Sequence, residues 1–66
     1  MRIIINGRER DLLPNQTLHQ FIVSMHLDPD VVVTELNGAI VPETAFTETI
    51  LHDGDRLELL SFVGGG

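Results

Sequence analysis

Asn-Gly pairs at residues 6–7 and 37–38 each separate two short runs of strand-like sequence. Asn-Gly is the strongest short-range signal of a tight β-hairpin, because both residues tolerate the positive φ angles that the turn requires. The pairs predict four strands, at residues 2–6, 8–13, 31–36 and 39–41. A proline follows each hairpin and ends its second strand. The rest of the chain must therefore complete or cover a sheet.

The segment between the two hairpins has the spacing of one helix. Thr17 and Gln20 stand three residues apart, as in a capping box, so a helix is expected to begin there. Apolar residues then recur at i, i+3, i+4 and i+7, which marks one buried helix face: Leu18, Phe21, Ile22 and Met25. Asp28, which precedes a proline, is expected to end the helix.

The segment after the second hairpin is less regular. Three of its apolar residues are expected to pack under the domain as a turn or short helix: Ala45, Phe46 and Ile50. A turn is expected at residues 53–55 and a last strand at residues 56–62.

One amphipathic helix and about five short strands are most economically arranged with the helix across one face of a mixed sheet. The first and last strands then pair in parallel in the middle of the sheet. The predicted fold class is therefore α+β, a β-grasp (ubiquitin-like) domain over residues 1–63.

The last three residues, Gly64, Gly65 and Gly66, form the least ordinary stretch of the sequence. Glycine makes up about 7% of average composition, so a run of three is a signal. Without Cβ atoms the run can thread a narrow channel, and it would carry the Gly66 carboxylate roughly 10 Å beyond the last packed side chain. We interpret residues 64–66 as a flexible tail that presents Gly66 to another protein's active site. A frayed end without function is the alternative.

Composition excludes several classes of function. The chain has no cysteine, so it holds no disulfide and no thiol that could carry sulfur. A net charge of -6, with no lysine, argues against binding to nucleic acid or to an anionic membrane surface. Apolar runs are too short to span a membrane, and Met1 leads straight into a strand pattern rather than a signal peptide, so a cytoplasmic location is expected.

No arrangement of side chains indicates catalysis or metal binding. A chain of 66 residues can hardly enclose a small-molecule site of roughly 300–1,000 Å³. His19, His26 and His52 lack further ligands at metal-site spacing, and the 53–55 turn lacks the later ligands of a calcium loop. The chain is expected to be a substrate rather than an enzyme. Its terminal carboxylate is a poor electrophile and must first be activated, most simply as an acyl-adenylate made from ATP.

Alternation along the first and last strands predicts a docking surface. Residues expected to face the helix are Ile3, Ile5, Leu57 and Leu59. Ile4, Leu60 and Phe62 then share the open face of the sheet. Apolar groups exposed beside the tail would mark a protein interface, and ordinary edge residues are the alternative.

Four features occur in one order along the chain: Thr17 at the helix start, Glu-Leu-Asn-Gly-x-Ile-Val-Pro at 35–42, Asp-Gly-Asp-Arg-Leu at 53–57, and Phe-Val-Gly-Gly-Gly at 62–66. Together they resemble the ThiS family, the sulfur carrier proteins of thiamine biosynthesis. The resemblance covers the whole chain. Asn-Gly-x-Ile-Val-Pro and the glycine ending are its most specific parts.

The resemblance implies a β-grasp fold and a carrier role. An adenylyltransferase (ThiF- or MoeB-like) would use MgATP to convert Gly66 to an acyl-adenylate, and the chain itself would bind no cofactor. A persulfide relay from a cysteine desulfurase would then replace AMP to give a thiocarboxylate. Thiazole synthase (ThiG-like) would receive the sulfur. The family commonly ends in two glycines, which match Gly65 and Gly66, and Gly64 would lengthen the tether.

Three alternatives remain at this point. The small subunit of molybdopterin synthase shares the fold and a Gly-Gly ending, but it is usually longer, tends to have proline before its final glycines and lacks the Asn-Gly-x-Ile-Val-Pro stretch. A protein modifier would form isopeptide bonds through Gly66, although the absence of lysine excludes self-chaining through side chains. A structural interaction domain would have no use for the glycines.

Overall fold

The computed structural model describes residues 1–62. The regular elements in this range are β1 (Arg2–Ile5), β2 (Arg8–Asp11), α1 (Leu18–Ser24), the 3-10 helix η1 (Pro29–Val31), β3 (Val32–Leu36), β4 (Ala39–Val41), the 3-10 helix η2 (Glu43–Ala45) and β5 (Arg56–Ser61). The predicted tail, residues 64–66, lies outside the described residues, so the domain boundary at residue 63 stays a prediction.

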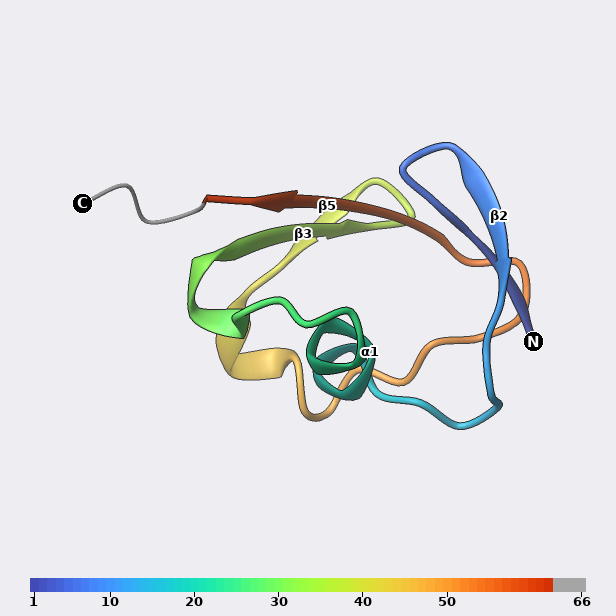
Figure 1. The fold of residues 1–66 in the computed structure, drawn as a ribbon, viewed down its shortest axis with the longest axis horizontal. Coiled ribbons are helices and arrows are strands. Elements are labelled where there is room, and N and C mark those ends of the chain that lie inside the picture. Colours follow the sequence, from blue (N-terminus) through green and yellow to red (C-terminus); the bar gives the residue numbers. More distant parts are fainter. Residues whose placement is uncertain (63–66) are drawn as a thin grey trace.

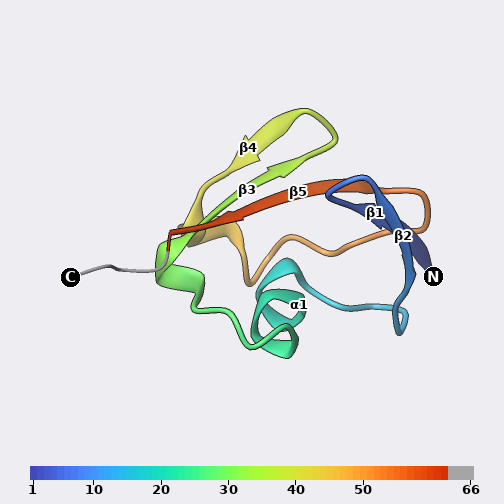
Figure 2. The ribbon, with the colours of Figure 1, turned by 45° about the horizontal axis from the view of Figure 1, so that its top comes forward.

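The strands form one mixed sheet in the order β2-β1-β5-β3-β4. β1 and β5, the first and last strands, pair in parallel, with Ile4 beside Arg56 and Ile5 beside Leu57. The other neighbouring strands are antiparallel. α1 crosses one face of the sheet and leaves the other face open (Figures 1 and 2). The predicted β-grasp arrangement is confirmed.

Both Asn-Gly turns have the left-handed backbone that their sequence predicts. Asn6 and Gly7 have φ angles of 49° and 82°, and Asn37 and Gly38 have φ angles of 51° and 87°. Each asparagine side chain also reaches β5. The Asn6 carboxamide accepts from the Leu59 N–H (2.8 Å) and donates to the Leu59 carbonyl (3.2 Å). The Asn37 Oδ1 accepts from the backbone N–H that opens β5 (2.9 Å).

The helix begins as predicted and ends earlier. The Gln20 N–H donates to Thr17 Oγ1 (3.0 Å) and the Thr17 N–H donates to Gln20 Oε1 (2.9 Å), which completes the capping box. The expected end at Asp28 is wrong, because His26 turns left-handed with a φ of 61°. The N–H groups of His26 and Leu27 then bond back to carbonyls within α1, at 3.0 and 3.3 Å. This Schellman motif stops the helix at Ser24.

The core lies between α1 and the sheet. It consists of Ile3, Ile5, Leu18, Phe21, Ile22, Val32, Phe46, Leu51 and Leu57. Phe46 follows the short helix η2 and is buried as expected, with Ala45 half-buried beside it. The expectation that Ile50 is buried is wrong: it is 48% exposed, whereas Leu51 is 2% exposed. Ile50 forms an antiparallel bridge with Thr17, and in extended backbone the next side chain points to the opposite side.

Candidate docking face beside the C-terminal strand

β5 carries the chain from the middle of the sheet towards its C-terminus. After its first residue, β5 pairs with β3 throughout, from Leu57 beside Leu36 to Ser61 beside Val32. The Phe62 N–H still donates to the Val31 carbonyl at 2.7 Å. The sheet therefore holds the backbone in an extended conformation up to Phe62, at the end of the molecule where η1 lies (Figure 1). Gly64, Gly65 and Gly66, predicted to thread and to be modified, lie outside the described residues.

The predicted alternation along β5 is present. Leu57 is fully buried under α1 and Leu59 packs half-buried against the core. Leu60 is 59% exposed and Phe62 is 55% exposed. Isolated apolar side chains are ordinary on a protein surface, whereas neighbouring ones mark an interface, so the docking role of Leu60 and Phe62 fits their exposure and stays a prediction.

Ile4, the third residue predicted for docking, lies apart from the other two. It shares the open face, but its partner on β5 is Arg56. Four residues of strand, about 13 Å, separate Arg56 from Leu60. Ile4 is also only half-exposed. The structure therefore brings Leu60 and Phe62 to one end of the face and leaves Ile4 at the other end.

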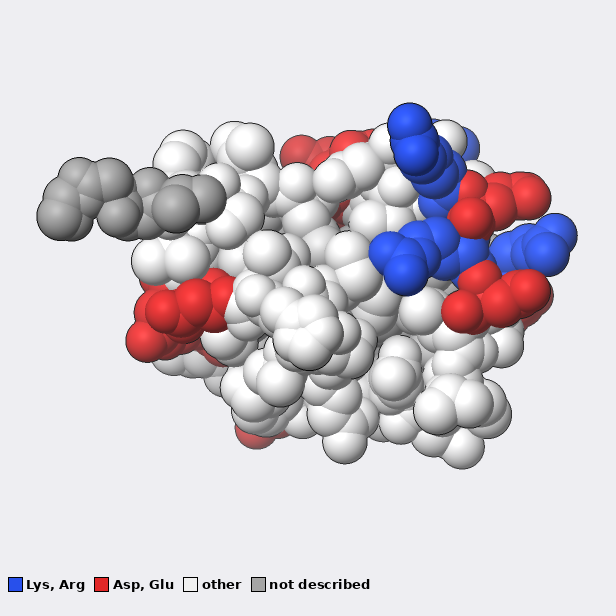
Figure 3. All heavy atoms as spheres, in the orientation of Figure 1, with Lys and Arg blue, Asp and Glu red and all other residues white. Residues whose placement is uncertain are grey.

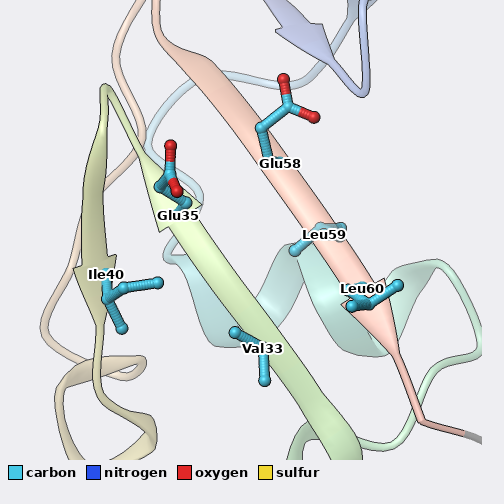
Figure 4. Close-up of a pocket in the computed structure, with 6 residues that line it drawn as sticks. All are labelled: Val33, Glu35, Ile40, Glu58, Leu59 and Leu60. Atoms are coloured by element: carbon cyan, nitrogen blue, oxygen red, sulfur yellow. The ribbon is translucent and has the colours of Figure 1, made fainter.

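Val33 and Ile40 take the place beside Leu60 that Ile4 was expected to fill. Val33 lies directly across from Leu60, and Ile40 lies directly across from Glu35 on the neighbouring strand. We call Val33, Ile40 and Leu60 the apolar patch. A hollow of about 330 Å³ opens over it, lined by Val33, Glu35, Ile40, Glu58, Leu59 and Leu60 (Figure 4).

Only part of this patch could have been predicted from the sequence. A two-residue turn at Asn37-Gly38 fixes the pairing of β3 with β4, so Ile40 opposite Glu35 could have been predicted. The pairing of Val33 with Leu60 could not, because the two residues are far apart in the sequence and no turn links their strands.

The arginines gather at one end of the molecule, where acidic side chains accompany them. On the face shown in Figure 3, they lie over the β1–β2 hairpin with Asp and Glu side chains between them. Arg2 pairs there with Glu9 (3.5 Å) and Asp11 (3.2 Å). Its hydrogen bond and its positive charge lower the pKa of Asp11.

The end near η1 is acidic. A hydrogen bond with Asp30, together with the charges of Asp30 and Asp28, raises the pKa of Glu43. This end of the molecule therefore presents carboxylates near exposed apolar side chains, and a basic surface would complement it.

Among residues 1–62, no group of three or more His, Asp or Glu side chains could hold a metal ion. The same range contains no helix long and apolar enough to cross a membrane. The residues that line the hollow over the patch include two carboxylates, Glu35 and Glu58, and otherwise only aliphatic side chains.

Comparison with known proteins identifies the family. The sequence model of the ThiS family matches residues 3–66. This chain belongs to the ThiS family. Sulfur carrier protein ThiS from Escherichia coli is 26% identical over 66 residues, which is the full length of both proteins. A crystal structure of the thiamine biosynthesis protein ThiS from Geobacter metallireducens superposes with a TM-score of 0.85 at 29% identity, again over the whole of both chains.

A second kind of relative is longer. Thiazole synthase from Paramagnetospirillum magneticum is 35% identical to this ThiS family member over 66 residues. The match covers 100% of this chain and 20% of that relative, so the chain spans about a fifth of the length of that thiazole synthase. A ThiS-like sequence and the name thiazole synthase therefore occur on one polypeptide in that organism.

Proposed function

We propose that this chain is a sulfur carrier whose Gly66 carboxylate is adenylated, converted to a thiocarboxylate and used by a thiazole synthase in thiamine biosynthesis. The observation that carries the proposal is the family match, which extends through the final glycines. The absence of cysteine supports it, because the chain has no thiol on which to carry sulfur. The proposal requires that the chain in the cell ends at Gly66.

Each chemical step acts on the carboxylate of Gly66. One carboxylate oxygen attacks the α-phosphorus of MgATP and pyrophosphate leaves, which gives the acyl-adenylate. The terminal sulfur of a persulfide, supplied by a cysteine desulfurase relay, then attacks the acyl carbon and AMP leaves. A thiol cleaves the remaining sulfur–sulfur bond and leaves a thiocarboxylate and a disulfide. The reactions belong to a cytoplasmic pathway, where ATP is supplied.

The chain is a substrate in this scheme, and its partners supply catalysis. A ThiF- or MoeB-like adenylyltransferase binds the MgATP, and the chain binds no cofactor of its own. Leu60 and Phe62 are exposed beside the tail, so they are the proposed contacts with that enzyme. Ile4, the third residue predicted for docking, lies at the other end of the open face, beside Arg56. Gly64 and Gly65 lack side chains that would obstruct a narrow channel to the active site.

The longer relatives support thiazole synthase as the sulfur acceptor. A ThiS-like sequence within a thiazole synthase implies that the two functions operate together in that organism. The relatives named sulfur carrier protein ThiS point to the same pathway. These relatives favour the thiazole acceptor over the molybdopterin alternative.

The proposal is tested by thiazole formation from purified components of the same host. The mixture contains the chain, the adenylyltransferase, the cysteine desulfurase, thiazole synthase, its other substrates and labelled cysteine. The full chain should transfer label to the thiazole, and a variant that lacks Gly65 and Gly66 should transfer none while it unfolds at the same urea concentration. Label transfer by the truncated chain would refute the proposal.

A further inference from the structure

Two glutamates occupy opposite positions on neighbouring strands at the open side of the sheet. Glu35 on β3 and Glu58 on β5 are directly opposite in the register. Side chains in such a pair have Cβ atoms about 4.5–5.5 Å apart, and like charges there destabilise a sheet. Within residues 1–62, both ion pairs shorter than 4.0 Å belong to Arg2, so neither glutamate has a cationic partner.

The glutamate pair borders the apolar patch. Val33 and Leu60 form the next cross-strand pair on this face, towards the C-terminus, and Ile40 lies across from Glu35. Figure 4 shows the two carboxylates at one side of the hollow and the three apolar side chains around the rest. The site thus combines two acceptor groups with an apolar surface in one hollow of about 330 Å³.

We propose that Glu35 and Glu58 together receive an arginine side chain of the adenylating partner, while an apolar side chain of that partner seats on the apolar patch. This inference rests on the proposed function and specifies the partner's surface. A guanidinium group offers several donors in one plane and is weakly hydrated, so it can bridge two carboxylates that stand side by side. Arginine and aromatic residues are also the types enriched at protein interfaces.

The distribution of charge favours this occupant. The chain's net charge is -6, and on the face in Figure 3 its arginines gather over the β1–β2 hairpin. The nearest cation in sequence on the open face is Arg56, two residues before Glu58 and on the side away from Leu60. A basic partner group is therefore attracted to the part of the face that carries Glu35 and Glu58.

The glutamate pair should have opposite effects on folding and on docking. In the free chain the two carboxylates repel each other, so replacing one should leave stability unchanged or raise it. In the complex each carboxylate pairs with the partner's arginine, so the same replacement should weaken docking. If a glutamate served only to stabilise the fold, replacing it would instead lower the free energy of unfolding.

The test compares Glu35→Gln and Glu58→Gln with Glu48→Gln, which removes the same charge elsewhere. Glu48 is exposed and follows η2, on the α1 side of the sheet, where the Leu18 N–H donates to the neighbouring Thr49 carbonyl. The readout is ATP–pyrophosphate exchange by the purified adenylyltransferase of the same host, at increasing NaCl. Each variant at the pair should lower kcat/KM about fivefold or more, mainly through KM.

Three further results are expected. Glu48→Gln should stay within about twofold of the wild-type chain. The loss at the pair should shrink as salt screens the wild-type interaction. The double variant should lose less than the product of the two single losses, because both carboxylates contact one group. Urea unfolding of the variants at the pair should occur at the same or a higher concentration.

Several outcomes would overturn the inference. Wild-type kcat/KM in both variants at the pair would show that they contact no cation of the partner. An equal loss in Glu48→Gln would assign the effect to overall charge. A loss matched by earlier urea unfolding would make the glutamates structural. If the wild-type chain supports no exchange at all, the proposed function fails as well, whereas exchange that persists in every variant refutes the arginine site alone.

Discussion

The two ends of β5 have different neighbours. At its start, Leu57 pairs with β1 on one side and with β3 on the other, and it is fully buried. At its end, Leu60 and Ser61 pair only with β3, and the β1 side is closed at Leu59 by the Asn6 carboxamide. One strand therefore anchors the fold at one end and presents exposed apolar groups at the other. The difference shows how one strand of a small domain can support the core at one end without burying, at the other end, the residues proposed to dock.

The largest expected effect is on stability, and it distinguishes the buried end of β5 from its exposed end. Leu57→Ala should lower the free energy of unfolding by about 2–5 kcal/mol, because it leaves a cavity between β5 and α1. Leu60→Glu should change it by less than about 0.5 kcal/mol, as for most surface substitutions. Urea unfolding measures both values.

For adenylation, we expect substitutions at the exposed end of β5 to have the large effects. Leu60→Glu and Phe62→Glu should each lower kcat/KM for adenylation by about tenfold or more, because each places a charge in the proposed interface. Pyrophosphate exchange measured well below the urea midpoint isolates docking from unfolding. If Leu60→Glu reduces stability and adenylation by the same free energy, Leu60 belongs to the core and the contrast between the two ends of β5 is wrong.

A smaller effect is expected at Asn6, which holds β5 at the boundary between its two ends. Asn6→Ala should cost about 1–3 kcal/mol, because it removes two hydrogen bonds to Leu59 and forces alanine into a φ of 49°. Asn6→Gly keeps the backbone freedom and removes only the hydrogen bonds. The difference in the free energy of unfolding between the two variants, measured in urea, gives the backbone contribution. If both variants unfold with the wild-type free energy, the Asn6 side chain does not stabilise β5.

The sequence predicts those features of the structure that are determined by residues close together in the chain. The two turns and the capping box at Thr17 are local, so residue types alone predict them. The end of α1 is also local, but His26 occupies a position where glycine or asparagine is usual, so the pattern gave no warning.

Features that depend on pairing between distant segments could not be predicted. Leu51 rather than Ile50 is buried because of a bridge to Thr17, more than thirty residues away in the printed sequence. Alternation assigned Ile4, Leu60 and Phe62 to one face, but their spacing along that face depends on the parallel register of β1 and β5. The pairing of Glu35 with Glu58 likewise follows from the register of β3 with β5.

A gain in stability is expected on the buried side of β3, next to β5. Thr34 is 1% exposed, and its Oγ1 has no hydrogen-bond partner among the described residues. Thr34→Val keeps the shape and removes the unsatisfied hydroxyl, so it should raise the free energy of unfolding by up to about 1 kcal/mol. Thr34→Ser, which keeps the hydroxyl and loses a methyl group, is the control and should destabilise. A destabilising valine would show that the hydroxyl is satisfied in solution.

The smallest effects concern pH and compare two carboxyl groups at opposite ends of the molecule, Asp11 beside Arg2 and Glu43 beside Asp30. Asp11 has a lowered pKa, so its pairing with Arg2 stabilises the fold above the unfolded pKa and is lost as pH falls through the folded value. Glu43 has a raised pKa, so its contribution is present below the unfolded pKa and is lost as pH rises through the folded value.

Two variants test this contrast in urea unfolding followed from neutral pH to about pH 2. Asp11→Asn should be less stable than the wild-type chain at neutral pH and should approach it in acid. Glu43→Gln should be the more stable chain at neutral pH, because it removes a carboxylate beside Asp30, and should also approach the wild-type value in acid. If the free energy of unfolding of a variant runs parallel to that of the wild-type chain over the whole pH range, the replaced carboxyl group does not contribute to the pH dependence of stability.

The intact mass of the chain, isolated from its own host in the presence of the host's activating and sulfur-transfer enzymes, is the first measurement to make on the proposed sulfur carrier. We expect a species that ends at Gly66 and is heavier than residues 1–66 by one oxygen-to-sulfur exchange, with fragmentation placing the sulfur on Gly66. A chain found only unmodified, or joined through Gly66 to an amine of another protein, would contradict this expectation.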